Sequence, residues 1–393
     1  MKKLNYFLEK WELSPALALS LRMTVSGYEA SRLPTQINGQ AVPVNRLSLQ
    51  SEADMPDEAF LLDGKLSFRR IQEESSRMMR RAEASVALCE MPRAEQKKGG
   101  AHPQNLKQLS RIRDFLASST YEENRLQIKS EARIQEPIVI LMNNSLKGIH
   151  RLDIDLLRAS SATLVLVSQL DLPSLQCIKL RLAAHARLEL IWLTPENAPD
   201  SLLNLYAELD EGSELRLFQP MLGGDARIQN QIFLNGRRSR TLTYAPAFAA
   251  GAQKQKIETN ILHRADGSYS RIRQKGVLLD RAQAALFGRQ IIEKETRDTD
   301  CYQESRFLVS SDKVRAHSHP VLVIDDNEVQ AGHAASVGRM DPGQRYYLMS
   351  RGLNEAEAER LITVAFLRSL IEEISVPALR DDLVRQVLNL VEI

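Results

Sequence analysis

The segment IKLRLAAHARLEL, residues 178–190, holds two short runs in which apolar and charged residues alternate. In the first run isoleucine and leucine alternate with lysine and arginine, and in the second leucine alternates with arginine and glutamate. Successive side chains of a β-strand point to opposite faces, so a period of two is typical of strands that bury one face. The segment therefore predicts two short strands whose apolar residues face an interior.

The same two-strand unit recurs along the chain at nearly even spacing. Strands of the first set begin near apolar residues with successive spacings of 26, 25, 25 and 29, namely Leu152, Ile178, Leu203, Ile228 and Ile257. Strands of the second set carry residue pairs spaced by 24, 27 and 27, namely Leu164/Leu166, Leu188/Leu190, Leu215/Leu217 and Leu242/Tyr244. Such a repeat is typical of a solenoid, because one coil cannot bury its apolar face but a stack can. It predicts a mainly β protein with a coiled core.

An antiparallel β-sandwich is the alternative architecture. Short Asn-Gly hairpins such as Asn235–Gly236 are nearly absent, although sandwiches and other antiparallel folds use them often. The repeats are also spaced too evenly for a sandwich. The solenoid is therefore the preferred fold.

Three regions of different texture give the expected domain boundaries. Residues 1–125 are expected to form a mainly helical N-terminal α/β region, residues 126–345 the β core, and residues 346–393 a C-terminal helical region. Asn354 opens a helix in the last region, and Pro377 separates it from a second helix. The broad apolar faces of these helices must be buried on the core, on each other or on a partner.

The composition is that of an ordinary globular protein. The 393 residues are 43% hydrophobic and 26% charged, with a net charge of +2. So small a net charge creates no field that recruits nucleic acid or anionic lipid. The N-terminus does not resemble a signal peptide, and no run approaches the roughly 20 apolar residues that span a bilayer. We therefore expect a cytoplasmic protein that binds neither nucleic acid nor membrane.

Sequence motifs give no sign of catalysis. The chain has no GxxxxGKS or GxxxxGKT phosphate loop, no GxSxG elbow and no HExxH zinc motif, so we expect a protein that is not an enzyme. Cys89, Cys177 and Cys301 form no CxxC pair, which argues against a disulfide framework or a zinc knuckle. We expect these cysteines to be buried and unreactive.

The junction between the repeats and the C-terminal helices holds the candidate chemistry. It reads IDDNEVQAGHAASVGRMDPGQRYYLMSRG, residues 324–352. Its single histidine, His333, lies among small residues that let another chain approach closely, although a purely structural histidine is an equal alternative. Just before it, His317 and His319 share one face of an expected strand, where imidazole and carboxylate ligands suit iron or zinc. Exposed histidines without a ligand are the alternative for this pair.

Several segments near this junction resemble one known family. They are HRADGSYS (263–270), KGVLLDRAQAALFGRQII (275–292), TDCYQ (299–303), IDDNEV (324–329), GHAASVG (332–338) and YLMSRG (347–352). Together they resemble the SufB/SufD family of iron–sulfur cluster assembly scaffolds. The resemblance implies a right-handed parallel β-helix flanked by helical regions. It is specific because it combines segments, none of which would be telling alone.

The resemblance also implies partners and site residues. Family members pair through late β-helix strands, as SufB–SufD heterodimers or SufD-like homodimers, and dock SufC, an ABC-type ATPase, on their C-terminal helices. The interface motif carried over to this chain is Asp325, Asp326, Gly332 and Gly338. The carried-over ATPase-docking region includes Tyr347, Arg351, Gly352, Leu361 and Phe366.

Departures from the family pattern favour the SufD-like branch. Ala331 occupies the usual cysteine position, Ala334 follows His333, and Ser305 stands where asparagine is usual. The chain is therefore expected to bind no cofactor stably by itself, whereas iron or a transient cluster is expected at His333 with ligands from a partner. Cys301 falls where the family commonly has alanine, so its thiol gains no support as a ligand.

Two other functions are compatible with the sequence. The first is a purely structural or dimerisation partner without a metal role, which explains Ala331 well. The second is a β-helical polysaccharide lyase or hydrolase. An aromatic content of 5% and the lack of a secretory signal disfavour this enzyme.

Overall fold

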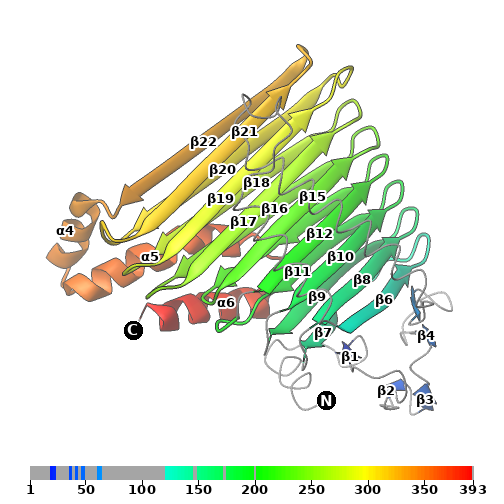
Figure 1. Ribbon diagram of the computed structural model, residues 1–393, viewed down its shortest axis with the longest axis horizontal. Coiled ribbons are helices and arrows are strands. Elements are labelled where there is room, and N and C mark those ends of the chain that lie inside the picture. Colours follow the sequence, from blue (N-terminus) through cyan, green and yellow to red (C-terminus); the bar gives the residue numbers. More distant parts are fainter. Residues whose placement is uncertain are drawn as a thin grey trace, which may run out of the picture.

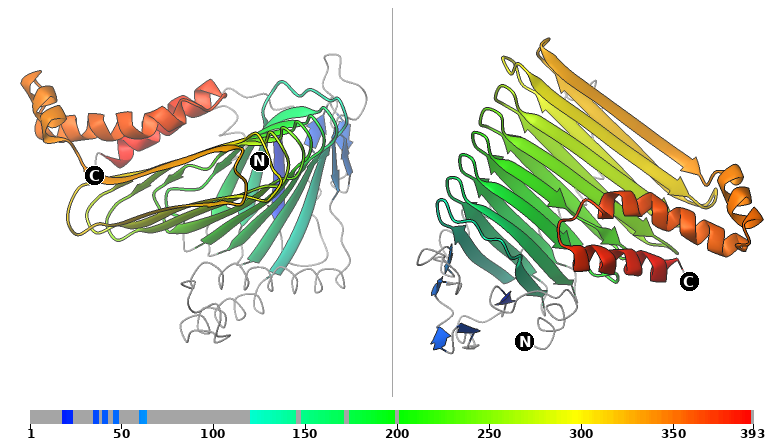
Figure 2. Two further views of the ribbon diagram at one scale, coloured as in Figure 1. Left: turned by 90° about the horizontal axis from the view of Figure 1, so that it is seen from above. Right: turned by 180° about the vertical axis from the view of Figure 1, so that it is seen from behind.

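The chain forms a two-sheeted parallel β-helix with helices along one side (Figures 1 and 2). The computed structural model describes residues 120–144, 148–170, 174–198 and 201–391, together with the backbone of short strands between residues 18 and 63. Coil after coil, the chain contributes one strand to each sheet, and neighbouring coils pair in parallel. The predicted β-helix is confirmed, and the parallel pairing rules out the antiparallel sandwich.

Both sheets run the length of the solenoid. Sheet 1 consists of β1 (Ala18–Met23), β7 (Ile138–Asn144), β9 (Ser161–Leu170), β11 (Arg187–Leu193), β13 (Glu214–Phe218), β14 (Met221–Leu222), β16 (Arg240–Ala249), β18 (Tyr269–Leu278), β20 (Thr299–Val309) and β22 (Val329–Arg339). Sheet 2 consists of β4 (Arg46–Ser48), β5 (Phe60–Asp63), β6 (Thr120–Ile128), β8 (Gly148–Leu156), β10 (Leu175–Leu182), β12 (Ser201–Leu209), β15 (Ala226–Leu234), β17 (Lys254–His263), β19 (Gln283–Ile292) and β21 (Arg315–Ile324).

Little of the N-terminal region is described. Strand β5 pairs antiparallel with β4 and β6, and β1 pairs in parallel with β7. Strands β2 (Thr35–Ile37) and β3 (Gln40–Val42) pair antiparallel, and the sequence between them is a second Asn-Gly dipeptide. The helices expected in residues 1–125 fall outside the described residues, as does Cys89.

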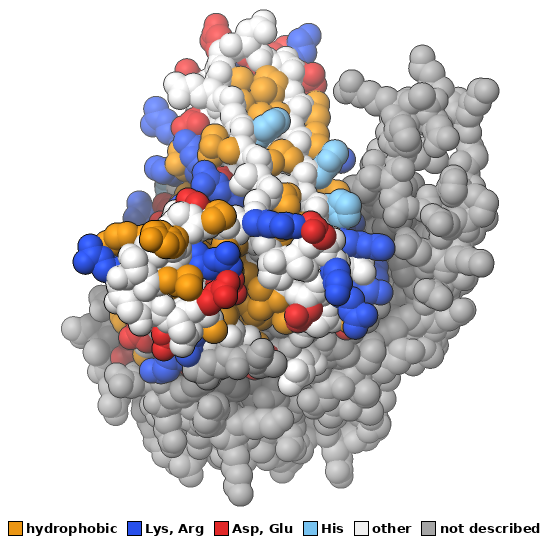
Figure 3. Space-filling model, turned by 90° about the vertical axis from the view of Figure 1, so that its left-hand side faces the viewer, with side chains coloured by type: hydrophobic (Ala, Val, Ile, Leu, Met, Phe, Trp, Pro, Cys, Tyr) orange, Lys and Arg blue, Asp and Glu red, His pale blue; other side chains and the backbone are white. Residues whose placement is uncertain are grey.

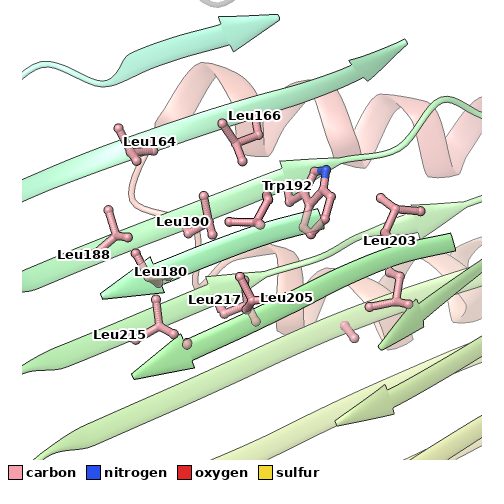
Figure 4. Close-up of a cluster of buried hydrophobic side chains, with 14 of the residues drawn as sticks. Leu164, Leu166, Leu180, Leu188, Leu190, Trp192, Leu203, Leu205, Leu215 and Leu217 are labelled. Atoms are coloured by element: carbon pink, nitrogen blue, oxygen red, sulfur yellow. The ribbon is translucent and has the colours of Figure 1, made fainter. Parts of the chain in front are cut away.

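The interior between the sheets is filled by large apolar side chains. Leu190 and Trp192 on β11 meet Leu180 and Leu205 from the opposite sheet, and all four are fully buried (Figure 4). Each buried leucine or isoleucine contributes roughly 1.5–3 kcal/mol relative to an exposed one. The alternation predicted for residues 178–190 therefore builds the core as expected.

The register of the coils matches the predicted repeat only in part. Leu203, Ile228 and Ile257 are direct partners in β12, β15 and β17, as predicted. Ile178, however, lies opposite Leu205, two residues beyond the predicted partner. Connections of different length shift the strand starts, so even spacing does not fix the register.

The pair Leu242/Tyr244 shows a second departure from the predicted pattern. In β16 these residues are on the outer face of sheet 1, because Tyr244 is opposite Phe218 while Leu217 faces inward opposite Thr243. They pack in a second apolar cluster beneath the helices. Both faces of sheet 1 are buried there, so large residues occur at inward and outward positions alike.

Three helices follow the last strand: α4 (Pro342–Ser350), α5 (Glu355–Ile371) and α6 (Pro377–Leu390). The predicted start of α5 is confirmed, because Asn354 and Glu357 form a reciprocal capping box. Helices α5 and α6 cover the outer face of sheet 1 (Figure 2). Helix α4, which the sequence pattern did not predict, has no buried residue. Among the described residues, no helix is long and apolar enough to cross a membrane.

Candidate functional site

The last coil, β21 and β22, leaves the solenoid open. Both are edge strands, and among the described residues no further strand pairs with either of them. Their side chains are intermediate or exposed, including Ile324 at 41% and Val337 at 50% of full exposure. Unpaired backbone groups and apolar side chains at a sheet edge are suited to adding strands from another chain.

His333 lies on the inward face of this open coil. It is opposite Gln303 of β20, which is opposite Ile272 of β18, and these two neighbours are fully buried. His333 is exposed, because no strand in the described part of the chain stacks beyond β22. Ala331, at the position where the resemblance implied a cysteine, is opposite Cys301. The nearest thiol in this row is therefore that of Cys301 on β20, the strand next to β22.

The other candidate histidines lie on the other sheet. His317 and His319 belong to β21 and share its outer face, and the His319 ring packs 5.9 Å from the ring of Phe287. Figure 3 shows histidine side chains beside hydrophobic ones on this end of the molecule. Within the part of the chain that the structure describes, no three His, Cys, Asp or Glu side chains are grouped to hold a metal ion.

The carried-over interface motif surrounds β22. Asp325 and Asp326 are in the turn before it, where the backbone N–H of Glu328 and further N–H groups hold the pKa of Asp326 below its usual value. A Cβ at Gly332 would contact Tyr302 at 3.2 Å, whereas one at Gly338 would meet nothing within 4 Å. The glycine at 338 thus leaves open space on the exposed strand.

A second exposed surface adjoins this edge. We define the α4 surface by Tyr346, Tyr347, Met349 and Leu361, which are 75%, 57%, 41% and 48% exposed. Figure 3 shows hydrophobic side chains gathered over these helices, with arginines and lysines among them. Of the predicted docking residues, Tyr347 and Leu361 belong to this surface. An exposed apolar patch rimmed by charges is typical of a protein-binding site.

The remaining predicted docking residues, Arg351, Gly352 and Phe366, are not among the residues that define this surface. The Arg351 guanidinium lies 5.3 Å from the Tyr347 ring, and Gly352 has φ +98, which favours glycine at the end of α4. Phe366 instead faces sheet 1, where the Lys275 ammonium lies 5.0 Å from its ring. Burial lowers the pKa of Lys275, which donates to Ser369 Oγ at 2.7 Å.

The far end of α5 is fastened to the middle of sheet 1. Arg216 donates to the carbonyl oxygen of Glu373 at 2.7 Å, and the Glu373 carboxylate is 3.4 Å from the guanidinium of Arg273. The backbone N–H of Ser375 donates to Glu189 Oε1 at 3.1 Å. One end of the helical layer is therefore anchored, while α4 at the other end is exposed and joined to β22 by only Met340 and Asp341.

His263, Cys177 and Cys301 are buried titratable groups of the solenoid. Both ring nitrogens of His263 lie within hydrogen-bond distance of serine hydroxyls, Ser268 at 2.7 Å and Ser270 at 2.8 Å, and burial lowers its pKa to about 4. Cys177 and Cys301 are buried, as predicted. Burial raises the pKa of Cys177 to about 12 and that of Cys301 to about 11, which disfavours the reactive thiolate form.

Several of these residues were missed by reasoning from the sequence. Tyr346 and Met349 are exposed on α4, a helix that the pattern did not indicate. The hydrogen-bond partners of His263 were also not predicted, although Ser268 and Ser270 follow it closely in the chain. The sequence signal that could have found these partners was the pair of serines spaced two residues apart shortly after His263.

Comparison with known protein families identifies the family of this chain. Residues 140–366 match the family described as "SUF system FeS cluster assembly, SufBD core domain". The chain therefore belongs to the SufBD family, as its motifs indicated.

Individual relatives are similar over shorter stretches. The iron–sulfur cluster assembly protein SufD of Bacillus subtilis is 38% identical over 164 residues, which cover 42% of this chain and 38% of that protein. A SufBD family protein of Mycobacterium tuberculosis is 31% identical over 220 residues, covering 53% of this chain and 55% of the relative. The chain thus matches little more than half the length of these relatives at most.

Proposed function

We propose that this chain is a SufD-like, non-catalytic subunit of the SUF iron–sulfur cluster assembly machinery. Its proposed partners are a SufC-like ABC ATPase on the α4 surface and a SufB-like subunit, or a second copy of the chain, on β21 and β22. The observation that carries the proposal is the direct connection of the two surfaces, since only Met340 and Asp341 separate β22 from α4.

This connection suggests how the chain would work. The anchored end of α5 resists displacement, so movement of α4 by a bound ATPase would be passed to β22 and to His333. Iron and sulfide are the proposed cargo, and the partner subunit would supply the ligands that this chain lacks around His333. The proposed role thus needs no chemistry catalysed by this chain alone.

The experiment is anaerobic co-purification of the full chain with its partners, with iron and sulfide analysis of each complex. Leu361→Lys on the α4 surface is expected to lose the ATPase and keep the second subunit. Ala335→Lys on β22 is expected to do the reverse. Asp381→Lys, an exposed change on α6, is the matched control and should retain both. Retention of both partners by Leu361→Lys and Ala335→Lys would refute the proposal.

A purely structural role remains the second candidate, and Ala331 favours it. His333→Ala separates the two functions, because the structural role predicts intact complexes with unchanged iron and sulfide. The SUF role predicts intact complexes with less bound iron or sulfide. Family membership gives no support to the polysaccharide-active alternative.

A further inference from the structure

The side chain of Gln303 crosses the interior next to the open coil. It starts on β20 in sheet 1, is fully buried, and ends at the backbone of β19 and β21 in sheet 2. In one amide orientation Nε2 donates to the Gly288 carbonyl oxygen at 3.1 Å, and Oε1 accepts from the Val321 N–H at 3.0 Å. The reverse orientation makes a single bond, from Nε2 to the Val321 carbonyl at 3.3 Å. The orientation that satisfies both amide groups is the one we assign.

Strand β21 is held by fewer backbone hydrogen bonds than an inner strand, so this contact is important for its position. It is the edge of sheet 2 and pairs only with β19 among the described strands. At the point where Gln303 arrives, the register places Pro320 opposite Gly288, and proline has no N–H to give to a ladder. A second link across the interior, from Ser318 Oγ to the Ser305 carbonyl, is long at 3.4 Å. Gln303 therefore makes the firmer connection between β21 and sheet 1.

Gly288 makes room for this connection. A Cβ at this position would lie 2.6 Å from the side-chain amide of Gln303, closer than real Cβ contacts allow. The backbone of Gly288 is not in the left-handed region, so no turn requires glycine here. The residue is small because a side chain from the opposite sheet ends against it.

We propose that Gln303 is a positioning residue that fixes edge strand β21 for pairing with a second subunit. Its register partner on β22 is His333, so the same row of side chains links both strands of the open coil. The contact between Gln303 and β21 is a property of this chain alone. Its role in subunit association rests on the proposed function.

Amide hydrogen exchange of the full chain tests whether Gln303 fixes β21. In Gln303→Ala, the amides of Val321 and its neighbours in β21 are expected to exchange ~10-fold faster, because two hydrogen bonds are lost, while β17 is unchanged. Gln274→Ala is the matched control, since this buried glutamine on β18 is bonded to Ser305 of β20 and leaves β21 at its normal rate. Normal exchange of β21 in Gln303→Ala would overturn the proposal.

Gly288→Ala gives an independent test of the same contact, because its new Cβ displaces the side-chain amide of Gln303 without removing it. Its β21 amides are expected to exchange faster as well. In the double variant Gly288→Ala/Gln303→Ala, exchange should be no faster than in Gln303→Ala alone, because there is no longer an amide to displace. Additive effects would show that the two residues act separately, against the proposal.

The affinity for the second subunit tests whether fixing β21 matters for subunit association. The dissociation constant for the second subunit is expected to rise at least ~10-fold in Gln303→Ala and to stay unchanged in Gln274→Ala. Faster exchange with unchanged association would overturn the interface role and leave the role of Gln303 in fixing β21 standing. Failure of the unaltered chain to associate through β21 and β22 would instead refute the proposed function.

Discussion

The middle coils and the last coil use the same backbone unit but have different neighbours. Thr243, Ile272, Gln303 and His333 occupy one inward row on four successive strands of sheet 1. The first three are buried, and His333 is exposed. Burial in a solenoid is therefore decided by the coil that follows, and not by the strand itself.

This difference separates stability from recognition. The middle coils bury leucines inside and a second apolar cluster beneath α5 and α6. The last coil instead presents small and polar residues at an unpaired edge, next to an exposed apolar helix surface. The middle coils form a complete core without the last coil, so the last coil is free to present residues for binding. Substitutions in equivalent positions of the two parts test this division.

The largest expected effect comes from truncating a core leucine. Leu190→Ala should lower the free energy of unfolding by about 3 kcal/mol, because it leaves a cavity in a closed coil. Val337→Ala, at a half-exposed inward position of the last coil, should cost about 0.5 kcal/mol or less. Urea unfolding followed by circular dichroism measures both. Equal losses would show that the last coil is packed as tightly as the middle ones.

A pH-dependent effect of similar size is expected from His263. Burial holds its folded pKa at about 4, whereas an unfolded histidine titrates near 6.5. The unfolded state therefore binds a proton first, and stability falls by up to about 3 kcal/mol as pH drops from about 6.5 to 4. Below that window both states are protonated, and this loss stops growing.

The comparison of two histidines checks this assignment. Unfolding at pH 7 and pH 4.5 should show that His263→Gln removes much of the loss, while His333→Gln in the open coil retains it. If His263→Gln kept the full pH dependence, other groups would be responsible for it.

A smaller difference is expected between two glycines. A Cβ at Gly276 would lie 2.4 Å from the buried ring of Phe307, so Gly276→Ala should cost about 1–3 kcal/mol. Gly338→Ala meets open space and should change stability by less than about 0.5 kcal/mol. Thermal unfolding of the two variants measures the contrast. A large loss at Gly338 would indicate that the last coil is filled in solution.

The repeat and its outcome show how far sequence reasoning reaches. Period-two alternation identified the strands, and the row Leu203–Ile228–Ile257 was predicted correctly. Ile178 was misplaced by two residues because connections differ in length between coils. Tyr244 was assigned inward because the pattern cannot reveal a helix that buries the outer face.

The candidate site was predictable to a similar extent. Motif resemblance identified the family and drew attention to His333, Tyr347 and Leu361. It did not indicate that Phe366 packs on sheet 1, nor that α4 exposes Tyr346. Exposure of a helix face depends on what lies against it, and one sequence contains no record of that contact.

By itself the sequence determined the repeating strand unit, the capped start of α5 and the residue types at the junction. These depend on neighbours within a few residues, where backbone geometry fixes which side chains share a face. Only the tertiary structure decided the register of the coils, the exposure of His333 and the reach of Gln303 to β21. Those features join residues from different coils and sheets, and their distances follow from the stacking of the whole solenoid.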